Sequence, residues 1–161
     1  TLGFAFKPIP AVRLAFDWQK IYYSDIKSVN NPFLPNLVTP ISGAQLGDNN
    51  GAGFGWEDMD IFKFGIEWER TEQWTYRFGY SYSDDQPIPD SEVLFNILAP
   101  ATIEQHATVG FTFTPDKQSE WNFAYMHAFE EEVKSSQTAF GVPGSIKMHQ
   151  NSFDVSYSYK F

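Results

Sequence analysis

The chain has 161 residues, enough for one ordinary domain, and its 20 acidic residues outnumber 11 basic ones, which argues against a general nucleic-acid binder. It contains no cysteine, so disulfide bonds and thiolate metal sites are excluded. Aromatic residues make up 18% of the chain, yet no stretch approaches the roughly 18 to 20 apolar residues of a membrane-spanning helix. No signal peptide is visible, because residues 1–7 already alternate like a strand. We therefore expect a mature chain or a fragment of a longer one.

Apolar and polar residues alternate with a period of two along most of the chain, and no segment shows a convincing helical period. The alternation predicts seven strands, at 1–7, 12–24, 59–70, 74–84, 103–114, 121–132 and 146–161. Between them lie short turns at 8–11, 71–73 and 115–120 and long loops at about 25–58, 85–102 and 133–145. In an up-and-down meander, all short turns then lie at one end of the sheet and all long loops at the other.

Two all-β architectures produce such an alternation: a soluble seven-stranded sandwich with its apolar faces inward, and a membrane barrel with its apolar face toward lipid. The expected strands run about 10 to 14 residues, longer than the usual 5 to 6 of soluble proteins and close to those of tilted membrane strands. The polar face also contains small residues such as Ala15, Gly65 and Gly79. A solvent-exposed face gains little from glycine, whereas a crowded lumen needs small residues.

Aromatic residues cluster near both ends of the expected strands. Near the short turns these are Trp68, Trp74, Trp121, Tyr157, Tyr159 and Phe161, and near the long loops they are Tyr22, Tyr23 and Tyr82. Tyr and Trp suit a membrane interface because one end of the ring is apolar and the other forms hydrogen bonds. Two such girdles around an apolar band are typical of outer-membrane barrels. The sequence therefore favours an all-β fold, an antiparallel transmembrane β-barrel.

The alternation continues to the last residue, Phe161. In a closed barrel the last strand pairs with the first, so it does not fray. A terminal Phe after alternating aromatics also resembles the C-terminal signal of outer-membrane barrels, so we expect the barrel-assembly machinery to recognise Phe161. Because bacterial single-chain barrels have an even number of strands, further strands are expected from upstream sequence or from association.

Several motifs resemble, in order and spacing, the FadL-type outer-membrane transporters. They are "WTYRFGYSYSDDQPIPDS" (74–91), "LFNILAPATIEQHATVGFTF" (94–113), "FAYMHAF" (123–129) and "YSYKF" (157–161), with "YYSDIKSVNNP" and "NNGAGFGW" before them. The resemblance covers nearly the whole chain. Members of that family carry long-chain fatty acids and, in some cases, aromatic hydrocarbons such as toluene.

The resemblance implies a 14-stranded barrel that is closed by an N-terminal plug. Residues 1–161 would be the C-terminal part of the barrel domain, with its last seven strands and last three extracellular loops, while the plug and the earlier strands are absent. The expected function is passive transport of long-chain fatty acids or other hydrophobic small molecules across the bacterial outer membrane, without catalysis or cofactor. Membrane lipid or lipopolysaccharide would surround the barrel, and no nucleic-acid partner is expected. A surface receptor or adhesin-type barrel and a general porin for polar solutes remain alternatives.

Charges of both signs are expected on the polar, lumen-facing side of the strands. The main candidates are Arg13, Asp17, Lys63, Glu67, Arg77 and Glu104, with Glu69, Glu130, Asp154 and Lys160 in the same phase. They are interpreted either as a ladder that holds the plug and lines the path of the substrate, or as charges that only neutralise one another.

Two apolar clusters lie in the expected loops. The first comprises Phe33, Leu34, Leu37, Val38 and Ile41, and the second comprises Leu94, Phe95, Ile97 and Leu98. Exposed apolar surface often marks an interaction site, so these residues are candidates for a rim that gathers hydrophobic substrate. The alternative is that the loops pack on one another and cap the barrel.

Other groupings give little support for an enzyme or a metal protein. His106, His127 and His149 are scattered over different strands, so we expect no metal site. Glu67 and Glu69 have no pocket or partner that suggests glycosidase chemistry. The segment "LGDNNGAGFGW" lacks the Lys-Ser/Thr pair of a phosphate-binding loop, and no G-x-S-x-G motif is present.

Overall fold

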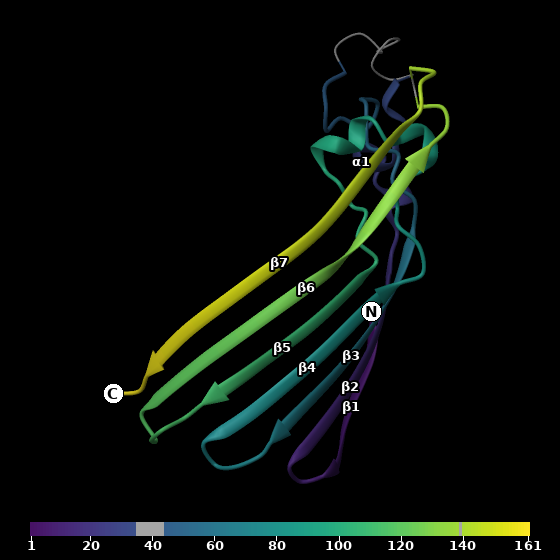
Figure 1. Ribbon diagram of the computed structural model, residues 1–161. Coiled ribbons are helices and arrows are strands. Elements are labelled where there is room, and N and C mark those ends of the chain that lie inside the picture. The colour runs from purple at the N-terminus through teal and green to yellow at the C-terminus, as the bar shows by residue number, and fades with distance from the viewer. Residues whose placement is uncertain (35–43, 139) are drawn as a thin grey trace.

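The computed structural model describes residues 1–34, 44–138 and 140–161, in which seven strands form one antiparallel sheet with the order β1-β2-β3-β4-β5-β6-β7 (Figure 1). The strands are β1 (Leu2–Ile9), β2 (Val12–Ile21), β3 (Met59–Glu69), β4 (Trp74–Ser83), β5 (Gln105–Phe113), β6 (Ser119–Ser135) and β7 (Gly144–Tyr159). Each strand pairs with its neighbours in sequence, as expected for a meander. Figure 1 shows the tight turns along one end of the sheet and the long connections gathered at the other.

The strand register separates two faces. One row of directly paired residues runs through Leu14, Ile66, Phe78, Val109, Tyr125 and Phe153. The adjacent row runs through Arg13, Glu67, Arg77, Gly110, Ala124 and Asp154. Because directly paired residues share a face and successive residues alternate, one face of the sheet is apolar and the other is polar.

The apolar face is uncovered in this chain: Phe64, Phe78 and Phe153 are 51%, 47% and 67% exposed. The buried apolar residues of the described segments are Ala52, Ile88, Val93, Ala128, Val133 and Ile146, and none belongs to that face. A sandwich would bury its aromatic face against a second sheet. The described residues provide no such sheet, so the architecture is that of a barrel wall.

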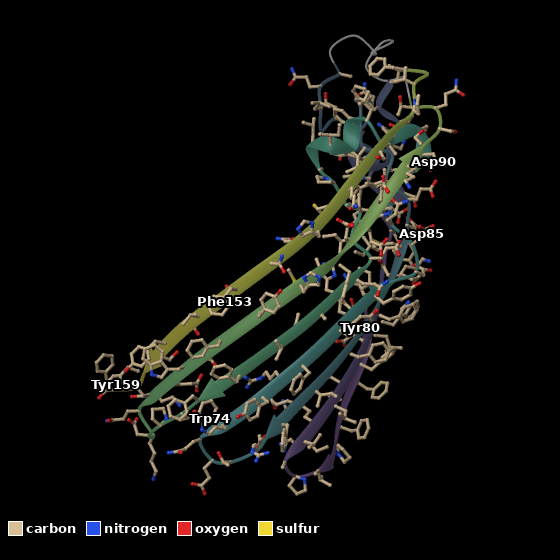
Figure 2. All side chains as sticks on the ribbon, in the orientation of Figure 1. Trp74, Tyr80, Asp85, Asp90, Phe153 and Tyr159 are labelled. Atoms are coloured by element: carbon tan, nitrogen blue, oxygen red, sulfur yellow. The ribbon has the colours of Figure 1, made fainter. Side chains whose placement is uncertain are left out.

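The aromatic girdle at the short-turn end is present as predicted. Trp121 packs on Tyr157 with ring centroids 4.6 Å apart, and Trp74 packs on Phe113 at 4.5 Å. Figure 2 shows Trp74 and Tyr159 at this end of the sheet, whereas Asp85 and Asp90 lie toward the long connections.

The third long connection is shorter than the predicted loop 133–145, because β6 and β7 continue to Ser135 and from Gly144. A register shift between Ala128 and Glu131 accounts for the difference. It is a β-bulge, which changes the phase of the alternation on β6. Beyond it, Val133 pairs with Ile146 and both side chains are buried.

The long connections contain short helical turns that the strand-period analysis does not reveal. Those that lie wholly within the described residues are the 3₁₀ turn η1 (Tyr23–Asp25), the helix α1 (Lys27–Asn30), and the 3₁₀ turns η2 (Asp90–Glu92) and η3 (Phe95–Leu98). Consequently β2 ends at Ile21 rather than at 24. Among the described residues, none of the helices is both long and apolar enough to cross a bilayer.

Candidate functional site

A charged ladder crosses the polar face near the short-turn end. Glu67 of β3 lies directly between Arg13 of β2 and Arg77 of β4 in the register. Its Oε2 accepts a hydrogen bond from Arg77 Nε at 2.9 Å, and its Oε1 lies 3.6 Å from an Arg13 guanidinium nitrogen. One carboxylate therefore serves two guanidinium groups, which leaves one positive charge in excess at this position.

The ladder continues through neutral groups toward β6. Arg77 donates to Thr112 Oγ1 at 2.6 Å, and the Thr112 hydroxyl donates to Asn122 Oδ1 at 2.6 Å. The Asn122 amide in turn donates to Glu120 at 3.0 Å. Such a chain of hydrogen bonds holds Arg77 in one orientation, because each group polarises and positions the next.

Two hollows flank Arg77 on this face. A hollow of about 190 Å³ is bordered by Arg13 and Glu67, and Ala15 and Gly65 form part of its lining. A second, of about 450 Å³, extends past Gly110 and Ala124 to Asp154. At Gly65 an added Cβ would meet only the Ala15 methyl group, at 3.7 Å, so small side chains keep the surface beside the ladder open.

The remaining predicted polar residues do not join this ladder. Asp17 and Lys63 are register partners, but Lys63 Nζ donates to Gln19 Oε1 at 2.7 Å, and the Asp17 carboxylate lies over Gly3. Glu104 lies just before β5, at the long-loop end. Burial raises its pKa, and the carboxylates of Glu131 and Asp85 raise it further.

The apolar residues of the loops divide into two groups. Phe95 stacks between Phe33, with ring centroids 4.1 Å apart, and Phe54, at 5.1 Å. These contacts join the first two long connections, as the loop-packing interpretation requires. Ile97 and Leu98, on the same 3₁₀ turn as Phe95, are 61% and 72% exposed. Among the described members of the two predicted clusters, these two residues extend into solvent as a rim would.

The other predicted members of this set are less informative. Leu34 and Leu94 are half-buried. Leu37, together with Val38 and Ile41, lies outside the described residues. The proposed substrate rim is therefore represented in the structure by Ile97 and Leu98.

A buried polar centre, which the sequence analysis did not identify, anchors η3. Asn96 is fully buried, and its amide donates to the carbonyl oxygens of Phe54 (2.8 Å) and Glu92 (2.9 Å). Its Oδ1 accepts a hydrogen bond from Trp56 Nε1 at 2.6 Å. A further hydrogen bond between the two connections runs from the backbone N–H of Phe33 to Glu92 Oε2, at 2.9 Å. The only hint in the sequence is an Asn inside an apolar segment, which is a weak signal.

The first connection approaches Glu92 so closely that it requires a glycine. Gly55 has a φ of +70°, and a Cβ at this position would lie 2.4 Å from the Glu92 side chain. A residue with a side chain would face both the unfavourable left-handed backbone conformation and this collision. Ile88 and Val93 add an apolar contact between the second connection and the β6–β7 hairpin, through Val133 and Ile146. The first two connections and the upper part of the β6–β7 hairpin are thus packed into one cap.

Nearly the whole chain matches the model of one known protein family. Residues 2–161 match the family model described as "Outer membrane protein transport protein (OMPP1/FadL/TodX)". The chain belongs to this family. The membership confirms the FadL-type resemblance of the sequence motifs, and the family is one of outer-membrane transport proteins rather than enzymes.

Solved structures support the same fold. The P. putida toluene transporter TodX covers 99% of this chain at 21% identity and a TM-score of 0.62, and the TodX monoaromatic hydrocarbon channel deltaS2 mutant has 22% identity and the same TM-score and coverage. This chain covers 33% and 34% of those structures, so it spans about one third of their length. A comparison with curated proteins gives no significant match. In this FadL/TodX-type chain the seven-stranded sheet is thus part of a larger barrel.

The three histidines of this FadL/TodX-type chain are held in separate environments. His106 lies 3.3 Å from Ser81 Oγ, His127 lies 2.8 Å from Asn151 Oδ1, and His149 lies 3.9 Å from Glu130. Across residues 1–34, 44–138 and 140–161, no three His, Asp or Glu side chains are grouped so that they could hold a metal ion.

Proposed function

We propose that the full-length protein containing this chain passively transports hydrophobic small molecules across the outer membrane, with long-chain fatty acids as substrates. Membership in the OMPP1/FadL/TodX family carries this proposal. The uncovered aromatic face suits contact with lipid, and the polar face suits a lumen that contains protein and water. Transport of this kind needs no catalytic group and no cofactor.

The charged ladder favours an anionic amphiphile over a neutral hydrocarbon. Arg13 and Arg77 share the single carboxylate of Glu67, and Arg13 is half exposed beside the smaller hollow. A fatty-acid carboxylate is complementary to the positive charge in excess, whereas a neutral aromatic ring gains little from it. Ile97 and Leu98 would gather the acyl chain at the extracellular rim.

The second candidate substrate class is monoaromatic hydrocarbons. Its support is that the similar structures are named as a toluene transporter and a monoaromatic hydrocarbon channel. Uptake assays separate the two classes. The full-length gene would be expressed in a strain that lacks its own transporter, and growth on oleate and on toluene would be compared, with conductance in planar bilayers as a check for a general porin.

Two variants connect the assay to the site. Arg13→Gln should lower uptake of oleate and leave uptake of toluene unchanged, because it removes the excess charge while Arg77 keeps its bond to Glu67. Lys7→Gln is the matched control, since Lys7 forms a separate ion pair with Glu69 at 3.2 Å. Equal oleate uptake by both variants would exclude a role of Arg13 in binding the carboxylate. Uptake of toluene without uptake of oleate would identify monoaromatic hydrocarbons as the substrate class.

The rest of the expected assembly is also a proposal. We infer that an N-terminal plug and further strands complete a 14-stranded barrel, and that the assembly machinery recognises the terminal Phe161. Phe161 is fully exposed beside Tyr159, where a partner can reach it. Deleting Phe161 should reduce the amount of folded protein in the outer membrane. A receptor or adhesin role would instead be indicated if removal of residues 85–102 abolished phage or cell binding and left uptake intact.

A further inference from the structure

The bulge in β6 directs charged residues onto the apolar side of the barrel wall. Ala128 pairs with Gln150 and Glu131 pairs with Met148, so Phe129 and Glu130 together face the single residue His149. The Glu130 carboxylate lies 2.8 Å from Lys147 Nζ and 3.9 Å from His149 Nδ1. Since Lys147 and His149 alternate in phase with Phe153 on β7, this ion cluster lies on the same face as the aromatic band. The prediction that Glu130 faces the lumen is therefore wrong, because the bulge changes the phase of β6 before this residue.

The chemistry of this face changes in steps along the β6–β7 hairpin. Phe153 and Tyr125 are paired in the aromatic band. In the next step toward the long connections, Asn151 Oδ1 accepts a hydrogen bond from the Tyr125 hydroxyl at 2.6 Å, with His127 Nδ1 2.8 Å away. The Glu130 cluster follows immediately. The side chains thus change from apolar to hydrogen-bonding to charged, in the same order as the layers of a bilayer from its hydrocarbon core to its head groups.

The charged group extends one step further from the band. Lys134 Nζ lies 3.1 Å from Glu132, which is the register partner of Lys147. Lys134, Lys147 and His149 are all exposed. Two lysines and two glutamates balance each other, so the group suits a partner that brings both phosphates and divalent cations. Lysines bind phosphate as point charges, and carboxylates share divalent cations with phosphate oxygens.

We propose that this surface, formed by Glu130, Glu132, Lys134, Lys147 and His149 and named the head-group site, binds the phosphorylated head group of lipopolysaccharide in the outer leaflet. The cationic side chains contact its phosphates, and the two carboxylates share the divalent cations that accompany them. The acyl chains then lie on the aromatic band at Phe129 and Phe153, which is continuous with the site. Long loops mark the extracellular end of such barrels, so the site lies at the outer leaflet.

Continuity with the aromatic band favours a glycolipid over free phosphate or a protein. A free anion would gain nothing from Phe129 and Phe153, which are 41% and 67% exposed beside the charges. A protein partner would have to replace lipid at a surface that the barrel presents to the membrane. The head-group site is independent of the transported substrate, so it stands whether or not the transport proposal does.

The test uses the full-length protein, purified and placed in nanodiscs. Binding of phosphorylated lipid A would be measured with magnesium present for the wild type and for Lys134→Ala/Lys147→Ala. The control is Lys117→Ala, which removes a lysine from the short turn at the opposite end. We expect roughly fivefold weaker binding for each lysine removed from the site, about 25-fold for the pair, and no change for the control.

Two further measurements complete the test. Heat-dependent mobility on a gel establishes that each variant is a folded barrel, and His149→Ala alone provides a milder change if the double variant fails to fold. Dephosphorylated lipid A should bind no more tightly to the wild type than to the double variant. Unchanged binding by the folded variants, or equal binding of the dephosphorylated lipid, would overturn the proposal. Displacement of lipid A by inorganic phosphate at equal concentration would also overturn it, because the ligand would then be a free anion.

Discussion

The assignment of the two faces is tested most sharply by adjacent residues of β5. Val109 lies on the apolar face between Phe78 and Tyr125, and Thr108 lies on the polar face beside Gly79. Both side chains are exposed in this chain, and because the two residues are consecutive in the strand they lie at nearly the same depth in the membrane. We predict that Val109→Arg prevents stable insertion, whereas Thr108→Arg is accepted.

The magnitude follows from the position of Val109 in its strand. It is the central residue of β5, Gln105–Phe113. At about 3.4 Å per residue the strand is roughly 27 Å long, and with a tilt near 40° it spans about 21 Å of membrane depth. Val109 is then about 10 Å from either end, near the midplane. An Arg facing lipid at that depth costs about 2 to 4 kcal/mol, or roughly 30- to 900-fold in the folding equilibrium.

The assay is urea-dependent folding of the full-length protein into lipid vesicles, followed by tryptophan fluorescence and gel mobility. The free energy of folding should fall by about 2 to 4 kcal/mol for Val109→Arg. For Thr108→Arg the change should stay within about 1 kcal/mol, because Thr108 borders the larger hollow on the polar face. A larger loss for Thr108→Arg than for Val109→Arg would mean that the two faces have been exchanged, and the assignment of the aromatic face to lipid would be wrong.

Two further predictions concern the connections at the ends of the sheet. Asn96→Ala removes three hydrogen bonds from a fully buried position and should destabilise the cap by about 3 kcal/mol. The loss should be seen as faster hydrogen exchange at the amides of Trp56 and Phe54. Ile97→Ala is the control, because Ile97 is exposed and its removal should leave exchange unchanged. In the short turn before β6, backbone N–H groups donate to Asp116 and hold the pKa of its carboxyl below the ordinary value. The stabilising contribution of the Asp116 carboxylate is therefore present above its unfolded-state pKa and is lost as the pH falls through its folded-state pKa. The difference in unfolding free energy between wild type and Asp116→Ala should vanish in acid and be constant near neutral pH.

The sequence by itself determined the seven strands, their antiparallel order and the chemistry of each face. Strand β4, predicted at 74–84 and observed at Trp74–Ser83, is an example. Its alternation of aromatic with polar or small residues is read directly because successive side chains of a strand must point to opposite faces. Short turns beside β3 and β4 allow only a hairpin there, so the meander also followed from local information.

Only the tertiary structure decided which side chains act together. The shared use of Glu67 by Arg13 and Arg77 depends on the register of three strands, of which β2 is far from the other two in sequence. The anchoring of η3 by Asn96 depends on where the first connection folds back over the second. Contacts of this kind join residues from 10 to 59 positions apart, and no local period records them.

In the hairpin β6–β7, the local sequence pattern also fails to predict where a strand ends. The predicted end of β6 at 132 followed the loss of a simple alternation, but the strand continues to Ser135 because one bulge between Ala128 and Glu131 changes the phase. Pairing with β7 holds the backbone extended across that irregularity, and burial of Val133 against the second connection stabilises the extension. The charges beyond the bulge face the lipid side for the same reason: the phase of a strand is set by its partner strand as well as by its own sequence.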